Sequence, residues 1–282
     1  MNKKSFSLLI CLILLITSFS ISAQNKINNN LNKNSHIIIY VDNPQNTADI
    51  LKSKGFDVLY NSITANSLEL IVNQDEYKIL NNMDLQPVVL SYGKPFFEIQ
   101  SENFKTFSQI PPGYHSLSEI INEMNNTQNA FPSICRVYDL TEHYNLNTTY
   151  EGRHIYAMKI SDNVLNDEDE PNFLMVSCHH AREIVTPVIA LYSISQFTTN
   201  YGIDPVITEI VNNYEIWISP VWNVDGYEYV YNVDNYWRKN RHPYPPGIGV
   251  DLNRNYPFGW YSSGSGSTDP TSETYKGPYP AS

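Results

Sequence analysis

Short apolar runs alternate with segments of helical period along most of the chain. Between residues 36 and 92 this pattern predicts a strand, a helix, two strands, a helix and a final strand. The strands are expected at His36–Val41, Phe56–Tyr60, Ser67–Val72 and Gln86–Ser91, and the helices at Thr47–Lys54, with Thr47 as N-cap, and at Asp75–Met83. The resulting order is β-α-β-β-α-β.

That order is the split β-α-β arrangement of ferredoxin-like α+β domains. Residues 36–92 contain no nucleophile motif, metal-ligand cluster or glycine-rich loop. We therefore expect a structural or inhibitory module there, since a fold alone assigns no activity. An Asn-rich stretch at residues 24–35 and a polar stretch at residues 93–113, which ends in Pro111-Pro112-Gly113, are expected to be linkers.

From residue 114 to residue 282 strands alternate with helices, which predicts an α/β fold with a mixed β-sheet and flanking helices. Ser116 is expected to cap a helix to about Met124, with Glu119 completing a capping box. The other expected strands are Ile134–Tyr138, Ile155–Ile160, Asn172–Ser177 and Tyr214–Val221, and the other expected helices are Pro187–Thr199 and Asp204–Asn212. Asn223–Tyr227 is expected to be a turn.

The first 23 residues have the pattern of a secretory signal peptide. Lys3 and Lys4 precede the apolar run Leu8–Ile16, and Ser22-Ala23 offers a small-residue cleavage point. The apolar run is too short to span a bilayer. We therefore expect a secreted, periplasmic or extracellular protein without a stable membrane anchor.

The net charge of the chain limits its possible binding partners. The chain of 282 residues has a formal net charge of −11, which argues against nucleic acid or an anionic membrane as a partner. Its 41% hydrophobic content is sufficient for a folded core. Removal of the signal would leave Cys135 and Cys178, whose redox state the sequence leaves open. The oligomeric state also stays open.

The stretch Met175–Pro187 carries the candidate chemistry. It joins an apolar strand to a helix, for which Thr186 is the expected N-cap and Pro187 the first helical residue. His180 and Glu183 then lie on the turn after the strand, where open α/β sheets place their ligands. Imidazole nitrogen and carboxylate oxygen are ordinary zinc ligands, but a catalytic zinc takes three protein ligands, so this pair needs support from elsewhere.

Arginines gather further along the chain. Trp237–Arg241 places two arginines beside an aromatic residue, and Gly249–Asn255 places Asn253 next to Arg254. A single arginine is by default a solvated surface charge. Several arginines in an acidic chain indicate recognition of a carboxylate, which a guanidinium can bind with two hydrogen bonds.

Five motifs occur in the order seen in zinc metallocarboxypeptidases. They are Glu151-Gly-Arg153, His180-Ala-Arg-Glu183, Trp237-Arg-Lys-Asn-Arg241, Gly249-Val-Asp-Leu-Asn-Arg-Asn255 and Ser272-Glu-Thr-Tyr275. From about Tyr114 onward the chain therefore resembles this family, and in particular secreted bacterial enzymes of the carboxypeptidase A/T type. Residues 36–92 resemble the family's activation propeptide in position and pattern.

The resemblance implies zinc as the cofactor and the C-terminus of a peptide or protein as the substrate. His180 and Glu183 would be two zinc ligands. Arg241 would polarise the scissile carbonyl and stabilise the developing oxyanion. The substrate-binding residues implied are Asn253 and Arg254 for the terminal carboxylate, and Arg182 and Arg238 along the approach to it.

The sequence departs from the family after Tyr275. The family's third zinc ligand is a His that lies beyond the Ser-Glu-Thr-Tyr stretch, and its general-base Glu comes later still. No His follows His242 here. We therefore expect residues 114–282 to be the N-terminal part of an incomplete carboxypeptidase domain, inactive and poorly stable by itself, with an unpaired sheet edge.

Four interpretations stay open. The first is a secreted zinc carboxypeptidase zymogen, and the second is a relative that cleaves peptidoglycan stem peptides or another amide. The third is a catalytically dead protein that keeps Asn253, Arg254 and Arg241 as a carboxylate-binding site without a complete metal site. The fourth is the unstable product of a decayed gene.

Overall fold

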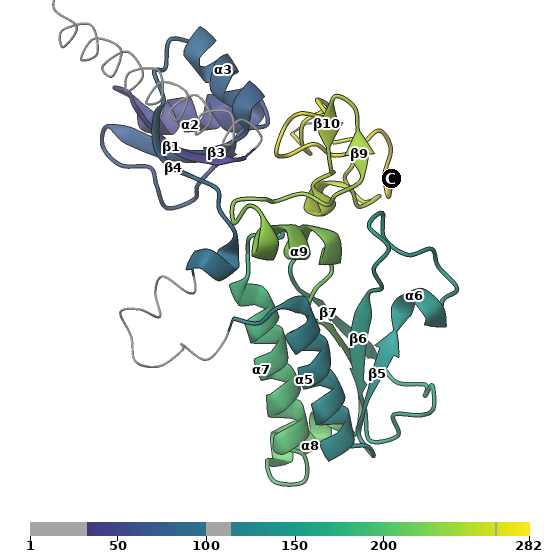
Figure 1. Cartoon of the computed structure of the whole chain (residues 1–282). Coiled ribbons are helices and arrows are strands. Elements are labelled where there is room, and N and C mark those ends of the chain that lie inside the picture. The colour runs from purple at the N-terminus through teal and green to yellow at the C-terminus, as the bar shows by residue number, and fades with distance from the viewer. Residues whose placement is uncertain (1–32, 100–113, 263) are drawn as a thin grey trace, which may run out of the picture.

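The computed structural model describes residues 33–99, 114–262 and 264–282, which form two four-stranded β-sheets with their own helices and a small two-stranded sheet (Figure 1). The expected signal peptide and most of both expected linkers lie outside the described residues. Within those ranges, no helix is long and apolar enough to cross a membrane.

The N-terminal unit, residues 35–92, is built on a four-stranded antiparallel sheet with the strand order β2-β3-β1-β4. Its elements are β1 (Ser35–Tyr40), α2 (Pro44–Ser53), β2 (Asp57–Val58), β3 (Ser67–Val72), α3 (Gln74–Asn82) and β4 (Val88–Tyr92). Alternate residues of β1 and β3, such as Ile37 and Leu70, are fully buried together with Leu51 of α2 and Leu80 of α3. Both helices therefore pack against one face of the sheet, which gives the predicted split β-α-β arrangement.

Side-chain caps set the helix starts in this unit, and one of them differs from the prediction. The Asn43 side chain accepts a hydrogen bond from the Asn46 N–H at 3.1 Å, and Pro44 takes the first helical position. Thr47 therefore lies inside α2, and its assignment as N-cap was wrong. The second strand is also shorter than expected, because only residues 57 and 58 pair with β3.

The C-terminal unit, residues 114–282, is built on a mixed four-stranded sheet. Its elements are α5 (Leu117–Ala130), β5 (Cys135–Asp139), α6 (Leu140–His143), β6 (Tyr156–Ile160), β7 (Asn172–Val176), α7 (Val185–Thr199), α8 (Pro205–Val211), β8 (Glu215–Ser219), α9 (Val224–Asn232), β9 (Pro243–Tyr244), β10 (Gly247–Ile248) and η1 (Leu252–Arg254). The strand order is β5-β6-β8-β7, in which β7 and β8 are parallel and the other pairs are antiparallel. The predicted α/β fold with a mixed sheet and flanking helices is confirmed.

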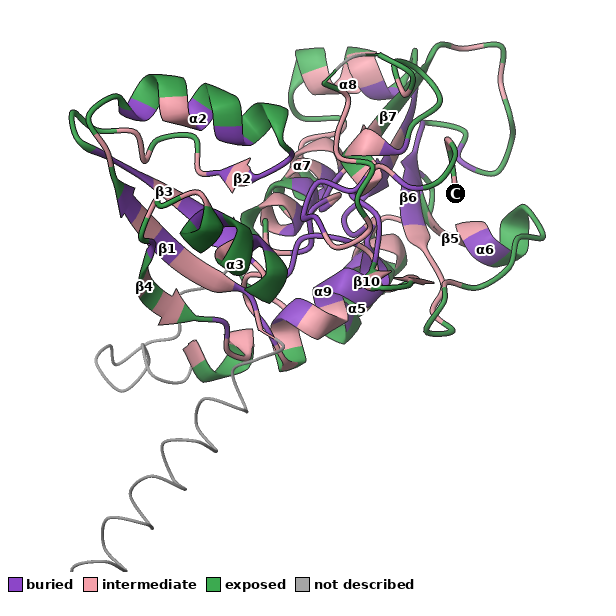
Figure 2. Ribbon diagram, turned by 90° about the horizontal axis from the view of Figure 1, so that it is seen from above, coloured by how far each residue is buried: buried purple, intermediate pink, exposed green. Residues whose placement is uncertain are grey.

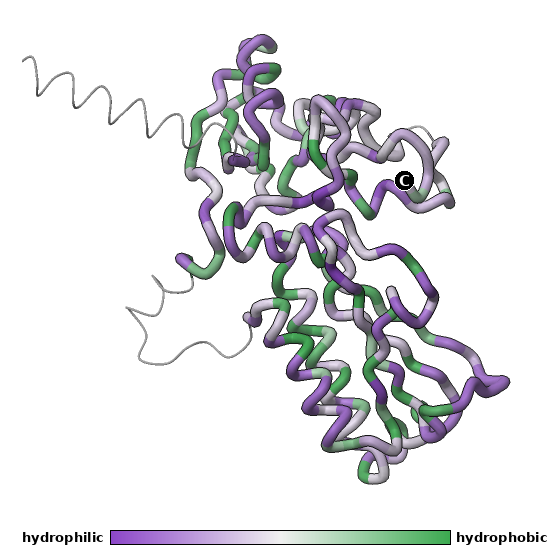
Figure 3. Tube along the Cα trace, turned by 45° about the vertical axis from the view of Figure 1, so that its right-hand side comes forward, coloured by the Kyte–Doolittle hydropathy of each residue, from purple (hydrophilic) through white to green (hydrophobic). Residues whose placement is uncertain are grey.

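Helices α5 and α7 lie side by side against this sheet (Figure 1) and bury its core. Met124 and Ile194 from the helices contact the cluster that contains Ile160 and Ile218 from the strands. Buried positions recur every three or four residues along α5 and α7. Figure 2 shows the burial and Figure 3 the hydropathy of each described residue. Among the described strands β7 pairs only with β8, and it exposes the apolar side chains of residues 173 and 174.

Three expectations for this unit need correction. Helix α7 begins at Val185, because the Thr186 hydroxyl accepts a hydrogen bond from the Cys178 N–H and does not cap the helix. The predicted turn at Asn223–Tyr227 is the start of α9, since the Asn223 side chain accepts from the Gly226 N–H and so caps a helix. The short helix α6 was not predicted, and α5 continues past residue 124 to residue 130.

A buried ion pair joins β6 to β8. The Lys159 ammonium lies 2.6 Å from the Glu215 carboxylate, and both side chains are almost fully buried. Burial by itself raises the pKa of Glu215, but the hydrogen bond from Lys159 outweighs it and holds the pKa below its ordinary value of 4.5. The stability that this carboxylate contributes is therefore present above about pH 4.5 and is lost as the pH falls further.

We expect Glu215→Ala to lower the free energy of unfolding by about 3–5 kcal/mol, because it leaves a buried ammonium without its partner. The double variant Lys159→Met, Glu215→Leu replaces the pair with apolar groups and should lose much less. Urea unfolding of the full chain at pH 7 measures both. A loss below about 1 kcal/mol for the single variant would contradict this prediction.

Candidate active site

The loops after the parallel strands β7 and β8 meet at the carboxyl end of the sheet. The Trp222 N–H donates to the Ser177 carbonyl, and the Asn223 N–H donates to the Cys178 carbonyl. Helix α9 packs closely against the loop that carries His180. A Cβ atom on Gly226 would lie only 2.8 Å from the Ala181 Cβ, so the close packing requires glycine at this position. This packing fixes the position of the loop.

His180 is buried and is hydrogen-bonded through both ring nitrogens. Its Nδ1 lies 2.7 Å from Glu183 Oε1, and its Nε2 lies 3.1 Å from Asp251 Oδ1. Burial lowers the pKa of His180, but the hydrogen bonds to the two carboxylates outweigh this effect and raise the pKa above its usual value. The structure therefore brings together the two residues of the predicted zinc pair.

Asp251, which was assigned no role from the sequence, connects the parts of the site. Its Oδ2 accepts hydrogen bonds from Arg238 Nε and Nη2 at 2.9 and 2.8 Å, and its Oδ1 accepts from the Asn253 N–H at 2.9 Å. Despite its burial, the bonds from His180 and the Arg238 charge hold the pKa of Asp251 well below its usual range. Its position two residues before Asn253, as the N-cap of η1, is the local signal that could have found it.

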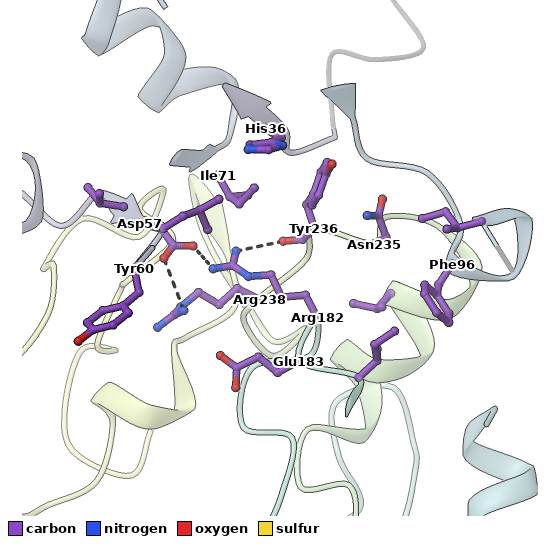
Figure 4. Close-up of a pocket in the computed structure, with 15 residues that line it drawn as sticks. His36, Asp57, Tyr60, Ile71, Phe96, Arg182, Glu183, Asn235, Tyr236 and Arg238 are labelled. Carbon is purple, nitrogen blue, oxygen red and sulfur yellow. Dashed lines mark hydrogen bonds and ion pairs between the residues drawn. The ribbon is translucent and has the colours of Figure 1, made fainter. Parts of the chain in front are cut away.

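Arg182 and Arg238 both contact Asp57 of the N-terminal unit (Figure 4). Arg182 Nη2 donates to Asp57 Oδ2, and Arg238 Nη1 lies 3.7 Å from Asp57 Oδ1. Burial alone raises the pKa of Asp57, but the two guanidiniums outweigh it and hold the pKa below its usual range. These three residues, together with Glu183 and Tyr236, line a cavity of about 700 Å³ between the two units.

Arg241 lines a different cavity, of about 370 Å³, together with His242 and Tyr150. Its guanidinium lies 3.6 Å from the centre of the Tyr229 ring and 4.4 Å from the Trp237 ring, which are cation–π distances. Arg241 Nε also donates to Glu151 Oε1 at 3.4 Å. The catalytic role predicted for Arg241 therefore stays a prediction.

Asn253 and Arg254 line a third hollow, together with Tyr256 and Trp260. The Arg254 guanidinium donates to the Asn253 backbone carbonyl at 3.0 Å. The predicted substrate-binding residues thus lie in two separate places. Arg182 and Arg238 line the cavity between the two units, and Asn253 and Arg254 line this third hollow. Their predicted roles are not tested by this arrangement.

The donor chemistry at His180 and Glu183 fits a zinc ion. An imidazole nitrogen and a carboxylate oxygen face each other, and Asp251 binds the second ring nitrogen, as a carboxylate that orients a zinc-binding histidine does. In the described part of the chain, two clusters of three potential ligands occur elsewhere, and neither includes this pair. Cys178 is buried, and its Sγ faces the backbone carbonyls of His180 and Ala181.

Comparison with known proteins places this chain in a family. A family model for zinc carboxypeptidases matches residues 120–282. The chain belongs to the zinc carboxypeptidase family. It is 34% identical over 185 residues to a zinc carboxypeptidase of Saccharothrix mutabilis subsp. capreolus, with 65% of this chain and 41% of the relative aligned. It is also 34% identical over 169 residues to metallocarboxypeptidase A of Trichophyton rubrum, with 59% of this chain and 38% of the relative aligned.

Solved structures show the same fold. Carboxypeptidase A from Helicoverpa armigera aligns with 89% of this chain and 64% of its own at a TM-score of 0.67 and 23% identity. Thrombin activatable fibrinolysis inhibitor aligns with 89% of this chain and 65% of its own at a TM-score of 0.61 and 23% identity. The chain spans about two fifths of the length of the curated relatives quoted above.

We expect Asp251→Asn to weaken zinc binding by the full chain about 10–100-fold, because the carboxylate orients the His180 ring and raises its basicity. A competition titration against a chromophoric zinc chelator measures this directly. His179→Ala is the matched control, since its ring bonds to the Tyr256 hydroxyl instead. Equal zinc affinity in the Asp251 variant and the wild type would contradict the orienting role.

Proposed function

We propose that this chain is part of a secreted zinc carboxypeptidase zymogen that hydrolyses C-terminal residues of peptides or proteins. The N-terminal unit would act as the inhibitory propeptide. Family membership, the His180–Glu183 pair and the arginines beside it support this proposal. The signal-peptide pattern of residues 1–23 supports export.

The observation that carries the proposal is the position of Asp57. It comes from β2 of the N-terminal unit, yet its carboxylate contacts Arg182 and Arg238 beside the predicted metal pair (Figure 4). A carboxylate in this position offers the guanidiniums the group that a substrate's C-terminus or an acidic side chain would offer. The N-terminal unit thus occupies cationic groups that a substrate would need.

The residues present suggest a division of labour. His180 and Glu183 would hold zinc, which when bound lowers the pKa of a bound water and polarises a carbonyl. Asp251 is hydrogen-bonded to both His180 and Arg238, so it would hold the zinc-binding histidine and this arginine in a fixed position relative to each other. The remaining zinc ligand and the general base are expected from the family pattern and have no assigned residue here.

A carboxylate-binding protein without catalysis is the second candidate. The guanidiniums of Arg182 and Arg238 both contact the Asp57 carboxylate directly, which is the observation that favours it. A peptidoglycan or amide hydrolase would share the same zinc pair and would differ in the preferred substrate. Metal dependence separates the first candidate from the second.

We expect Asp57→Asn to increase the affinity of the full chain for a peptide with a free C-terminal carboxylate at least tenfold. The substitution removes the carboxylate that competes for the two arginines and breaks a buried charge pair between the units. Isothermal titration with the free peptide and with its amidated form measures the change. The amidated peptide should gain nothing.

Asp49→Asn is the control, because Asp49 is an exposed carboxylate on α2 that bonds only to Gln45 among the described contacts. Titrations with and without a zinc chelator complete the test. Chelator-sensitive binding and release of a C-terminal residue would support the enzyme, and chelator-insensitive binding alone would support the second candidate. No gain in affinity for the Asp57 variant would overturn the blocking role of the N-terminal unit.

A further inference from the structure

A second contact between the two units begins two residues before Asp57, at Gly55, and buries acidic groups. On the side of the N-terminal unit it consists of the turn after α2 and the start of α3. On the other side it consists of residues 267–275, around the Ser272-Glu-Thr-Tyr275 motif. We call this contact the α3 joint.

Direct hydrogen bonds tie the two sides together. The Ser272 and Thr274 hydroxyls both donate to the Gly55 carbonyl, at 3.0 and 2.7 Å. The Asn73 side chain donates to the Thr271 carbonyl at 2.6 Å. The Glu273 N–H donates to Glu76 Oε1 at 3.0 Å, so a carboxyl group of one unit accepts from the backbone of the other.

The α3 joint contains more buried acid than buried base. Glu76 and Glu273 are both almost fully buried, and Glu273 Oε2 has no hydrogen-bond partner in the described part of the chain. The buried cation beside them is Lys239, whose Nζ donates to the Pro270 and Ser272 carbonyls. Two carboxylates and one ammonium leave one negative charge in excess, which a single proton would neutralise. An uncompensated buried charge is costly, so docking favours the protonated pair.

Charged groups further out do not alter this balance. Arg182 and Arg238 face Glu273, but they are already paired with Asp57 and Asp251, so those four charges sum to zero. Asp269 adds a negative charge on the loop, exposed to solvent. The excess negative charge therefore stays with Glu76 and Glu273.

We propose that the α3 joint is a pH-sensitive latch: the Glu76 and Glu273 carboxyl groups together hold one proton while the N-terminal unit is docked, and loss of that proton as the pH rises releases the unit. The consequence for substrate access rests on the proposed function, in which this unit covers the site. The latch itself concerns docking alone.

The direction of the pH effect follows from the environment of the pair. Burial and the neighbouring Glu273 carboxyl raise the pKa of Glu76 from its ordinary 4.5 to about 8. The docked state then binds more protons than the released state between these values, so docking is strongest below about pH 4.5 and weakens as the pH rises through about 8. The lowered pKa of Asp57 acts in the opposite direction, but only below its ordinary value of 3.8.

Hydrogen exchange of the full chain between pH 5 and pH 8 tests the latch. After correction for intrinsic exchange rates, protection of the Glu273 amide should fall by up to tenfold per pH unit, because one proton is linked to docking. Lys276 is the internal reference, since its N–H donates to the Ser267 carbonyl within the same loop. Its protection should stay level.

Glu273→Gln removes the excess charge and leaves Glu76 opposite Lys239, so protection of residue 273 should become nearly independent of pH. Asp75→Asn is the matched control: it removes an exposed carboxylate of the same helical turn, paired with Lys78, and should keep the wild-type slope. Should Glu273→Gln fail to fold, the wild-type profile still decides.

A change below about threefold between pH 5 and pH 8 in the wild type would overturn the proposal. So would an unchanged slope in a folded Glu273→Gln variant. These readouts need no catalytic activity. Protection of the Glu273 amide that does not change with pH, together with tighter peptide binding by Asp57→Asn, would overturn only the latch. Protection that falls with pH, without tighter peptide binding by Asp57→Asn, would overturn only the blocking role of the N-terminal unit.

Discussion

The buried carboxylate of Asp251 is the interaction on which the rest of the site depends. One oxygen binds the His180 ring and the backbone at Asn253, and the other binds the Arg238 guanidinium. A fully buried carboxylate is costly unless its oxygens are satisfied, and these bonds satisfy both. The same group therefore fixes the imidazole that faces Glu183, the cation beside it and the start of η1. Removing it would disturb the predicted zinc pair and Arg238 together.

Charge also governs how the N-terminal unit sits on this site. Its first contact pairs one carboxylate, Asp57, with two arginines, and its second buries a carboxyl pair beside one ammonium. Ionisation of Asp57 strengthens the first contact, and protonation of the Glu76–Glu273 pair strengthens the second. Docking thus combines two joints whose electrostatics respond in opposite senses to pH, with the strongest docking expected in mildly acidic solution.

Local patterns predicted the elements well and their exact starts less well. The alternation of Ile37 with Ile39 and of Leu68 with Leu70 identifies two strands of the first sheet, and the capping box at Ser116 identifies α5. The predicted N-cap was wrong where two residues could cap the same helix. Asn43 with Pro44 outranks Thr47 because the earlier pair satisfies more of the free N–H groups at the helix start. Thr186 was a plausible cap, but tertiary structure gave its hydroxyl a partner at the strand end.

By itself, the sequence determined the two-part α/β organisation, the ordered motifs of the zinc carboxypeptidase family and the His180–Glu183 pair. These features depend on periodicity and on residues three positions apart, so they are visible along the chain. Only the tertiary structure decided that Asp251 joins His180 to Arg238, that Asp57 reaches the arginines, and that two acids are buried together at the α3 joint. Each of these contacts joins residues far apart in sequence, and their burial determines their charge state. Neither the distance between these residues in the folded chain nor their burial can be read from a local sequence pattern.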